Sequence, residues 1–286
     1  MFQNIVVGTD GSERAARAVA QAADLARANN STLHVIHAYQ GTRESIEEAG
    51  RKVVERIEDD LASSGVRLET YALQGDPADV MIDWSDSHEA DLIVVGNKGM
   101  TGRRGRFLGS IPNAVSHDAM AAVMIVQTQS DARGFRVIVA GTDGSERAGR
   151  AVLFAAELAN AFGAQLHLVL AYKGVAQATA DALASGAVVT PPADLEEEAK
   201  DEAAAIGGRL DAQAEALRAR GLMVETHAIT GGPANAILDT ANGVGADLVV
   251  VGNRGMTGSK RVLGSVPNTL SHQAKCAVLI VPTDDR

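Results

Sequence analysis

The chain has 286 residues, of which 46% are hydrophobic and 22% charged, and its formal net charge is −10. This length suffices for two domains of ordinary size, each with its own core, and the composition is normal for a globular protein. The acidic balance argues against general nucleic-acid binding, which requires a basic face, and no segment approaches the ~18 apolar residues of a membrane span.

The first half of the chain alternates predicted strands and helices. Residues 4–8 form a short apolar strand, and Ser12 begins a helix whose small apolar residues recur at helical spacing to about Ala28. The further predicted elements are strand 32–39, helix 44–63, strand 66–73, helix 76–89, strand 91–96, helix 110–120 and strand 122–127. Strands separated by single helices predict a parallel sheet covered on both faces. Ligands of such sheets bind beyond the carboxyl ends of the strands, where the winding direction reverses.

The second half of the chain repeats the first. The octapeptide GTDGSERA at Gly8–Ala15 recurs at Gly141–Ala148, an offset of 133 residues, whereas the glycine-rich segments described next recur at an offset of 156. The difference, 156 − 133 = 23 residues, predicts an insertion in the second copy at about residues 173–195. We therefore expect two tandem domains, residues 1–130 and 135–286, each an α/β fold with its own doubly wound, parallel five-stranded sheet.

A basic, glycine-rich loop follows the fourth predicted strand of each copy. The segment Val94–His117 reads VVGNKGMTGRRGRFLGSIPNAVSH, and Val250–His272 reads VVGNRGMTGSKRVLGSVPNTLSH. Each loop is rich in Lys and Arg, contains no acid, and leads into a helix that we expect to begin with Ser at the N-cap and Pro in the first turn. Free backbone N–H groups and the positive helix end attract anions. The pattern predicts two phosphate-binding loops; the alternative is a solvated turn with scattered basic residues.

The motif GTDGS supplies an aspartate at the carboxyl end of the first strand of each copy, Asp10 and Asp143. One interpretation is a turn or capping residue before the following helix. The other is a carboxylate in the switch-point cleft, where it meets a ribose hydroxyl, an adenine amino group or a cation bound to phosphate. If strands one and four of each copy are neighbours, each aspartate and its glycine-rich loop line one cleft.

Together these residues resemble the ATP-binding branch of the universal stress protein family. The resemblance is carried by the spacing Gly96-x₂-Gly99-x₉-Gly109-Ser110, with the Asp10 motif ahead of it, and covers nearly the whole chain as two tandem domains. It implies the adenine nucleotide alpha hydrolase-like sheet order 3-2-1-4-5, which places strands one and four side by side. The family also pairs domains through their fifth strands, so residues 123–126 and 278–281 are expected to meet as a pseudo-two-fold pair.

The resemblance also implies two sites for ATP, with Mg²⁺ accompanying the nucleotide. In the first site Gly8, Thr9, Asp10 and Ala38 would surround adenine and ribose, Val95, Gly96, Lys98 and Gly99 would follow the nucleotide, and Gly109, Ser110 and Ile111 would hold the phosphates. The second set would be Gly141, Thr142, Asp143, Ala171, Val251, Gly252, Arg254, Gly255, Gly264, Ser265 and Val266. The second loop is one residue shorter, which either pulls it away from the phosphates or is absorbed by flexible Gly258.

Three functions fit these features. The first, which we favour, is a regulatory stress-response protein whose bound ATP biases its conformation or its binding of a partner, with cyclic AMP as a competing ligand for the same cleft. A slow ATPase is the second, but no general base or Walker lysine pattern is visible, and we predict no catalytic residue. The third is an interaction module that binds no nucleotide and whose loops are plain turns.

The remaining expectations concern metals, partners and location. The seven histidines show no metal-ligand spacing, so we predict no metal site in the protein itself. The predicted partners are an adenine nucleotide and, as an option, a second copy of the chain, with no nucleic acid and no membrane. A single cysteine, Cys276, and an N-terminus that leads straight into a strand without a basic leader predict a cytoplasmic protein.

Overall fold

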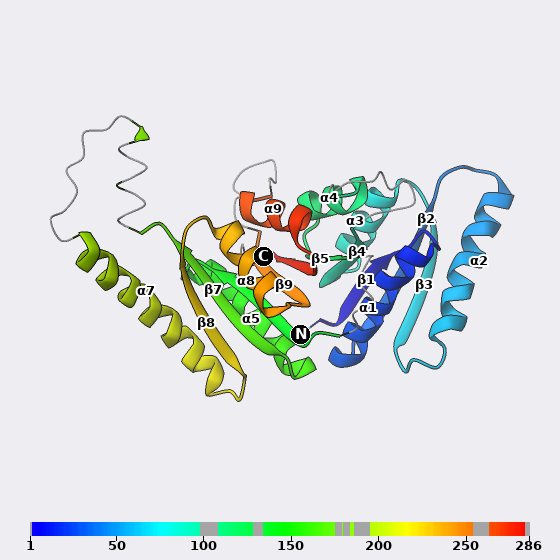
Figure 1. Ribbon diagram of the computed structural model, residues 1–286. Helices are drawn as coiled ribbons and strands as arrows, with labels where there is room; N and C mark the ends of the chain where they lie inside the picture. Colours follow the sequence, from blue (N-terminus) through cyan, green and yellow to red (C-terminus); the bar gives the residue numbers. More distant parts are fainter. Residues whose placement is uncertain are drawn as a thin grey trace.

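A single ten-stranded sheet organises the protein. The structure is a computed structural model, which describes residues 2–97, 108–127, 134–174, 179, 184–185, 195–253 and 263–283. The strands are β1 (Asn4–Gly8), β2 (Thr32–Tyr39), β3 (Arg67–Gln74), β4 (Leu92–Gly96), β5 (Ala122–Val126), β6 (Val137–Thr142), β7 (Gln165–Tyr172), β8 (Val224–Thr230), β9 (Leu248–Gly252) and β10 (Ala277–Val281). Their order across the sheet is β3-β2-β1-β4-β5-β10-β9-β6-β7-β8 (Figure 1).

The continuity of this sheet differs from the two separate sheets that we expected. Each half has the order 3-2-1-4-5 and parallel strand pairs, but β5 lies antiparallel beside β10, with Met124 opposite Leu279. Every residue of β5 and of β10 is buried. An apolar strand left at the edge of a separate sheet would expose unpaired backbone groups, and the antiparallel pairing removes both edges at once.

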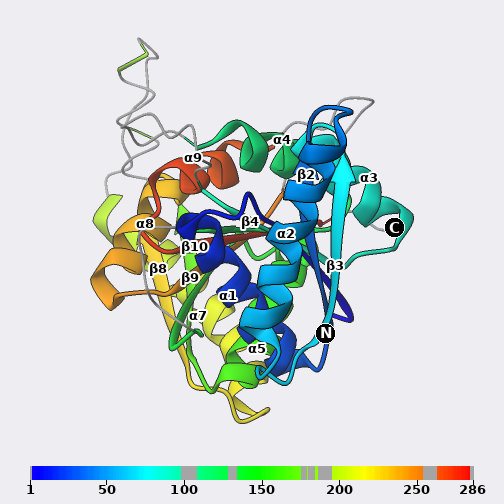
Figure 2. The same cartoon turned by 90° about the vertical axis from the view of Figure 1, so that its right-hand side faces the viewer.

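Helices cover both faces of the sheet. They are α1 (Glu13–Asn29), α2 (Glu44–Leu61), α3 (Pro77–Ser87), α4 (Ser110–Asp118), α5 (Glu146–Phe162), α7 (Leu195–Arg218), α8 (Pro233–Val244) and α9 (Ser265–Gln273). Helices α1, α2, α5 and α7 pack into one apolar cluster, and α3, α4, α8 and α9 pack into the other. Figure 2 shows α4 and α9 on the opposite side of the sheet from α1 and α5. Each cluster contains residues of both halves, so the core continues across the β5–β10 pair.

Local sequence signals explain where the helices begin and end. The Ser12 hydroxyl accepts a hydrogen bond from the backbone N–H of Ala15 at 3.2 Å, and Asn30 ends α1 in the left-handed conformation. Asp76 caps α3 in the same way through the N–H of Ala78 at 3.0 Å. The predicted insertion at about 173–195 lies largely outside the described residues. Among the helices that the structure describes, none is long and apolar enough to cross a membrane.

Candidate functional site

The topology places the two predicted parts of each site at one edge of the sheet. Strand β1 lies beside both β2 and β4, so the winding direction changes at β1, and β6 has the same position between β7 and β9. The motif GTDGS begins at the last residue of β1, Gly8, and near the end of β6, at Gly141. The two helices that follow the glycine-rich loops, α4 and α9, begin at the same edge. This switch point is where ligands of doubly wound folds bind.

The GTDGS motif forms the same tight turn in both copies. The Thr9 hydroxyl accepts a hydrogen bond from the N–H of Gly11 at 3.1 Å, and Asp10 Oδ1 accepts one from the N–H of Ser12 at 3.0 Å. Gly11 has φ +74°, a left-handed conformation that favours glycine. Asp10 therefore has the turn role that the sequence left open. A carboxylate accepts more than one hydrogen bond, so this role leaves capacity for a ligand.

The second copy repeats this turn through Thr142, Asp143 and Gly144. The hydroxyl of Thr142 accepts from the N–H of Gly144 at 3.1 Å, and Asp143 Oδ1 accepts from the N–H of Ser145 at 3.0 Å. Gly144 has φ +76°. Asp143 is exposed and Asp10 is half-buried, so both carboxylates reach solvent at the edge of the sheet.

The observed turn role of Asp10 and its predicted role in ligand binding can be separated by substitution. The substitution Asp10→Asn retains Oδ1, and with it the turn, but removes the negative charge. We expect the ligand-free midpoint of thermal unfolding to stay nearly unchanged and nucleotide affinity to fall, whereas Asp10→Ala should also lose about 1 kcal/mol of stability through the lost hydrogen bond. Differential scanning fluorimetry and calorimetric titration measure the two quantities. Equal nucleotide affinity in Asp10→Asn and the wild type would leave Asp10 as a turn residue alone.

Glycine, not serine, caps the helix after each loop. Gly109 is the N-cap of α4 and Gly264 that of α9, and Ser110 and Ser265 are the first helical residues, which corrects our expectation of serine caps. Neither glycine position provides a side-chain hydrogen bond to its helix, whereas Ser12 and Ser145 do so for α1 and α5. The N-cap residue of α4 and of α9 thus offers no side chain to the first-turn N–H groups, as suits an anion site.

Two buried asparagines that the sequence reasoning missed hold the ends of these loops. The backbone N–H of Asn97 donates to Val126 O at 2.8 Å, and Asn97 O accepts from the N–H of Gly109 at 3.0 Å. The first loop is therefore closed at its base. In the second copy Asn253 Oδ1 accepts from both the N–H and the hydroxyl of Thr283, at 3.0 and 2.9 Å. The signal was available, because both asparagines directly follow the glycine that ends a strand.

In the second copy most of the predicted site residues line one pocket of about 470 Å³. The predicted residues in its wall are Gly141, Thr142, Asp143, Val251, Gly252, Gly264, Ser265 and Val266. Gly252 and Gly264 flank the second loop, which is one residue shorter than the first. Both glycines line the pocket, so the shorter loop still brings its two ends to the same pocket. Ala171 is not part of this wall, and Arg254 and Gly255 lie outside the described residues. The pocket adds Arg147, which the sequence reasoning did not single out.

In the first copy the corresponding residues occupy the same places in the fold. Gly8, Thr9 and Asp10 follow β1, Ala38 is near the end of β2, Val95 and Gly96 end β4, and Gly109, Ser110 and Ile111 begin α4. Lys98 and Gly99 lie outside the described residues. A pocket of about 330 Å³ beside Thr9 opens between α1 and α2, away from α4.

Helix packing explains one pair of glycines that recurs in the two copies, Gly8 and Gly141. A Cβ atom at Gly8 would overlap the sulfur atom of Met81 in α3, and one at Gly141 would come within 2.5 Å of Ile237 Cδ1 in α8. Both glycines let a helix approach the strand closely, so packing alone accounts for them. Gly109 differs, because a Cβ atom there would be in ordinary contact, 3.4 Å from Asn97 O.

These features define a doubly wound α/β protein made of two repeated units, with a pocket at the switch point of the second unit. The model of the universal stress protein family matches residues 1–127 and 134–282. The chain belongs to the universal stress protein family. The two matches correspond to the two halves of the sheet.

Relatives of known sequence and structure agree with this family. A universal stress protein of Mycobacterium tuberculosis is 37% identical over 143 residues, which cover 44% of this chain and 97% of that protein. One of Thermus aquaticus is 35% identical over 137 residues, covering 44% of this chain and all of the relative. The crystal structure of a universal stress protein of Archaeoglobus fulgidus has 19% identity and a TM-score of 0.72, and covers 98% of both chains. At that identity the last comparison supports the fold alone.

Proposed function

We propose that this universal stress protein binds ATP at the carboxyl edge of each half of the sheet, and that the bound nucleotide acts as a regulatory ligand. The pocket of the second copy is the observation that carries this proposal. Its volume, about 470 Å³, falls within the range of pockets that hold small molecules. Its wall joins the end of β6, the end of β9 and the start of α9, the three parts that the sequence pattern assigns to one ligand.

The wall of the pocket suits the parts of a nucleotide. Val251 and Ile237 offer an apolar surface for a base, and the Asp143 carboxylate offers an acceptor for ribose hydroxyls. Gly264 and Ser265 supply the uncapped helix N-terminus for phosphate, and Arg147 adds a cation. Mg²⁺ that accompanies a triphosphate would find its oxygen ligands mainly on the nucleotide, with Asp143 as the nearest protein carboxylate in this wall.

The first copy repeats the turn, the uncapped helix start and the neighbouring strand ends, so we propose a second ATP site there. Residues 1–130 and 135–286 would each carry one site. Regulation rather than turnover is favoured because the described pocket wall holds one carboxylate and no histidine to serve as a general base.

Release of the bound molecule tests this function. Protein purified without added nucleotide is denatured, and the supernatant is analysed by chromatography and mass spectrometry. We expect ATP or its hydrolysis product, and calorimetric titration of nucleotide-free protein should show two ATP molecules per chain. Preferential binding of cyclic AMP would replace ATP as the ligand, and sustained multiple turnover would make the protein an enzyme. Failure to bind any adenine nucleotide would reject the proposal.

A further inference from the structure

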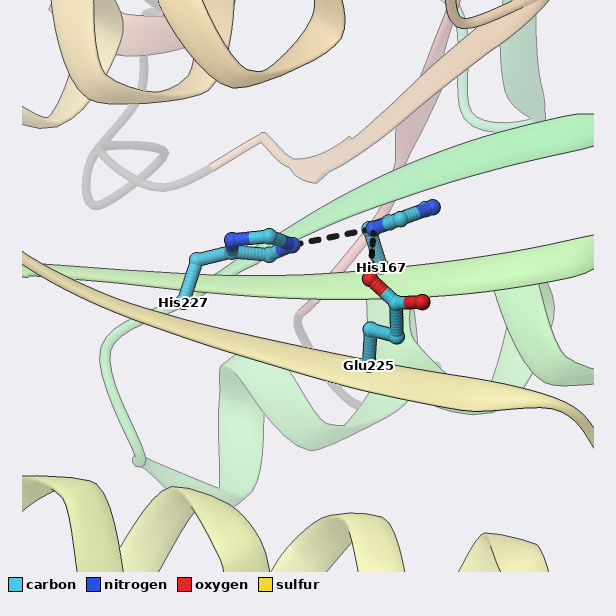
Figure 3. A group of neighbouring side chains, drawn as sticks. All are labelled: His167, Glu225 and His227. Atoms are coloured by element: carbon cyan, nitrogen blue, oxygen red, sulfur yellow. Dashed lines mark hydrogen bonds and ion pairs between the residues drawn. The ribbon is translucent and has the colours of Figure 1, made fainter. Parts of the chain in front are cut away.

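Two histidines and a glutamate meet on one face of the sheet in the second half (Figure 3). In the register of β7 and β8, His167 lies opposite Glu225 and Val169 opposite His227. Glu225 and His227 are two residues apart on one strand, so their side chains point to the same face. His167 is 3% exposed, His227 is half-buried and Glu225 reaches solvent. The spacing rule for histidine motifs missed this cluster because its members come from two strands.

The distances within the cluster suit a small metal ion. His167 Nδ1 lies 2.9 Å from His227 Nε2 and 3.5 Å from Glu225 Oε2. In a tetrahedral site with metal–ligand bonds of about 2.0–2.1 Å, neighbouring ligand atoms are about 3.3 Å apart, a value between these two distances. Gln165 Nε2 donates to the other carboxylate oxygen, Glu225 Oε1, at 2.7 Å and so orients the carboxylate, as outer ligands of metal sites do.

The ligand chemistry indicates the class of ion. Two imidazole nitrogens and one carboxylate oxygen suit first-row divalent transition metals such as Zn²⁺, whereas Mg²⁺ and Ca²⁺ prefer oxygen alone. Among the described residues this is the one group of three such side chains whose ligand atoms all lie within 4.8 Å of one another.

The first half carries the same framework in a form that is closed to metal. His34 and Glu69 stand where His167 and Glu225 do, but Tyr71 replaces His227. The Tyr71 hydroxyl donates to Glu69 Oε2 at 2.6 Å, and burial, together with Glu69, raises the pKa of Tyr71 to about 12, so the phenol stays protonated.

An aromatic side chain also covers the histidine of the first half. The Trp84 ring packs against His34, with ring centroids 4.7 Å apart. Its counterpart in the second half is Thr240, a much smaller side chain whose hydroxyl donates to Ala236 O of its own helix at 2.8 Å. These two replacements, Tyr71 by His227 and Trp84 by Thr240, both favour a metal ion in the second half.

We propose that His167, Glu225 and His227 form a binding site for a divalent transition metal of the Zn²⁺ class, with water completing the coordination. This cluster shares no residue with the described wall of the nucleotide pocket, which follows the carboxyl ends of β6 and β9. The proposal is thus independent of ATP binding. The His167–His227 hydrogen bond and the close approach of His167 to Glu225 already hold the three side chains together.

Titration of the nucleotide-free full chain with ZnCl₂ tests the site. We expect calorimetry to show one tight Zn²⁺ ion per chain, and Co²⁺ to give the intense visible absorption of a four-coordinate site. The variant His227→Tyr copies the first half and should weaken Zn²⁺ binding by more than about tenfold. Loss of a residue that only orients a ligand already lowers metal affinity about tenfold, and His227 would be a direct ligand. Glu225→Gln should do the same while retaining the oxygen that Gln165 contacts.

A histidine outside the cluster provides the control. His272→Gln removes a half-buried imidazole from α9 and should leave the tight Zn²⁺ ion in place. Circular dichroism and unfolding midpoints show whether each variant folds. If His227→Tyr does not fold, Glu225→Gln is the variant that tests the site. Absence of tight Zn²⁺ binding by the wild type, or equal binding by Glu225→Gln and the wild type, would overturn the proposal. Either result would leave the ATP proposal unaffected.

Discussion

Replacing Gly109 with valine is expected to abolish one of the two proposed ATP sites while leaving the ligand-free protein folded. Gly109 has φ −65° and ψ 163°, a conformation that any residue adopts. A Cβ atom at this position would be 3.4 Å from both Asn97 O and Pro112 Cδ, which is ordinary contact. The folded chain therefore does not require glycine here. A phosphate bound at the N-terminus of α4 would require glycine at this position, because a branched side chain would occupy the space directly beside the first-turn N–H groups.

The expected loss of affinity is large. Hydrogen bonds to a charged group contribute about 1.5–3 kcal/mol each, so displacement of one or two of them weakens ATP binding by roughly 100-fold. Calorimetric titration should give two sites for the wild type, one for Gly109→Val, one for Gly264→Val and none for the double variant. The cost to the helix itself is only about 1 kcal/mol, since glycine is merely a moderate N-cap.

The unfolding midpoint of the ligand-free variant separates the two effects. If Gly109→Val binds two ATP molecules with wild-type affinity, the helix start is not the phosphate site. If the ligand-free Gly109→Val variant unfolds at a much lower temperature than the wild type, glycine is required at this position for stability. Gly8→Ala provides the contrast, because its Cβ would overlap the sulfur of Met81 and should destabilise the protein directly.

Periodicity and repetition were enough to predict the elements of each half, whereas the order of the strands within each half was implied by the resemblance to the family. The Ser12 cap reports a local preference that the folded chain keeps. Residues 32–39 also form the predicted strand, although Leu33–Ile36 are all buried and do not alternate. The joining of β5 to β10 into one sheet depends on contacts between residues more than a hundred positions apart. The resemblance to a family, rather than any local signal, was what predicted that these two strands meet.

The candidate site was predictable only in part, for similar reasons. The positions of Asp143 and Gly264 follow from repeated motifs, and both line the pocket. The glycine caps were mistaken for serine caps because Ser110 and Ser265 are good caps by composition, and the choice between adjacent residues depends on backbone geometry. Arg147 and the cluster at His167 were missed because their neighbours come from other elements of the chain.

Truncation of Leu279 to alanine is expected to lower the stability of both halves together. Leu279 lies in β10 opposite Met124 of β5, is fully buried, and belongs to an apolar cluster that includes residues of both halves. A Leu→Ala change in such a position costs about 2–5 kcal/mol of unfolding free energy. Denaturant unfolding followed by circular dichroism should show a single transition that moves to lower denaturant with no change in slope.

The matched control is the same substitution at an exposed position. Leu153 in α5 is 49% exposed, so Leu153→Ala should change the unfolding free energy by no more than about 0.5 kcal/mol. A shared core would be contradicted if denaturant unfolding showed two transitions and Leu279→Ala shifted only one of them. In that case the β5–β10 pair would hold two units that fold separately.

A shared core also determines how the proposed ligands act on the protein. If unfolding involves both halves at once, ATP bound in either site stabilises the entire sheet, by about 2.7 kcal/mol when its concentration is 100 times the dissociation constant. The unfolding midpoint of Gly109→Val should then still rise with ATP, through the second site alone and by about half the wild-type free energy. Occupancy of one cleft would thus stabilise the other half through the apolar cluster that the two halves share, which includes Met124 and Leu279 at the centre of the sheet.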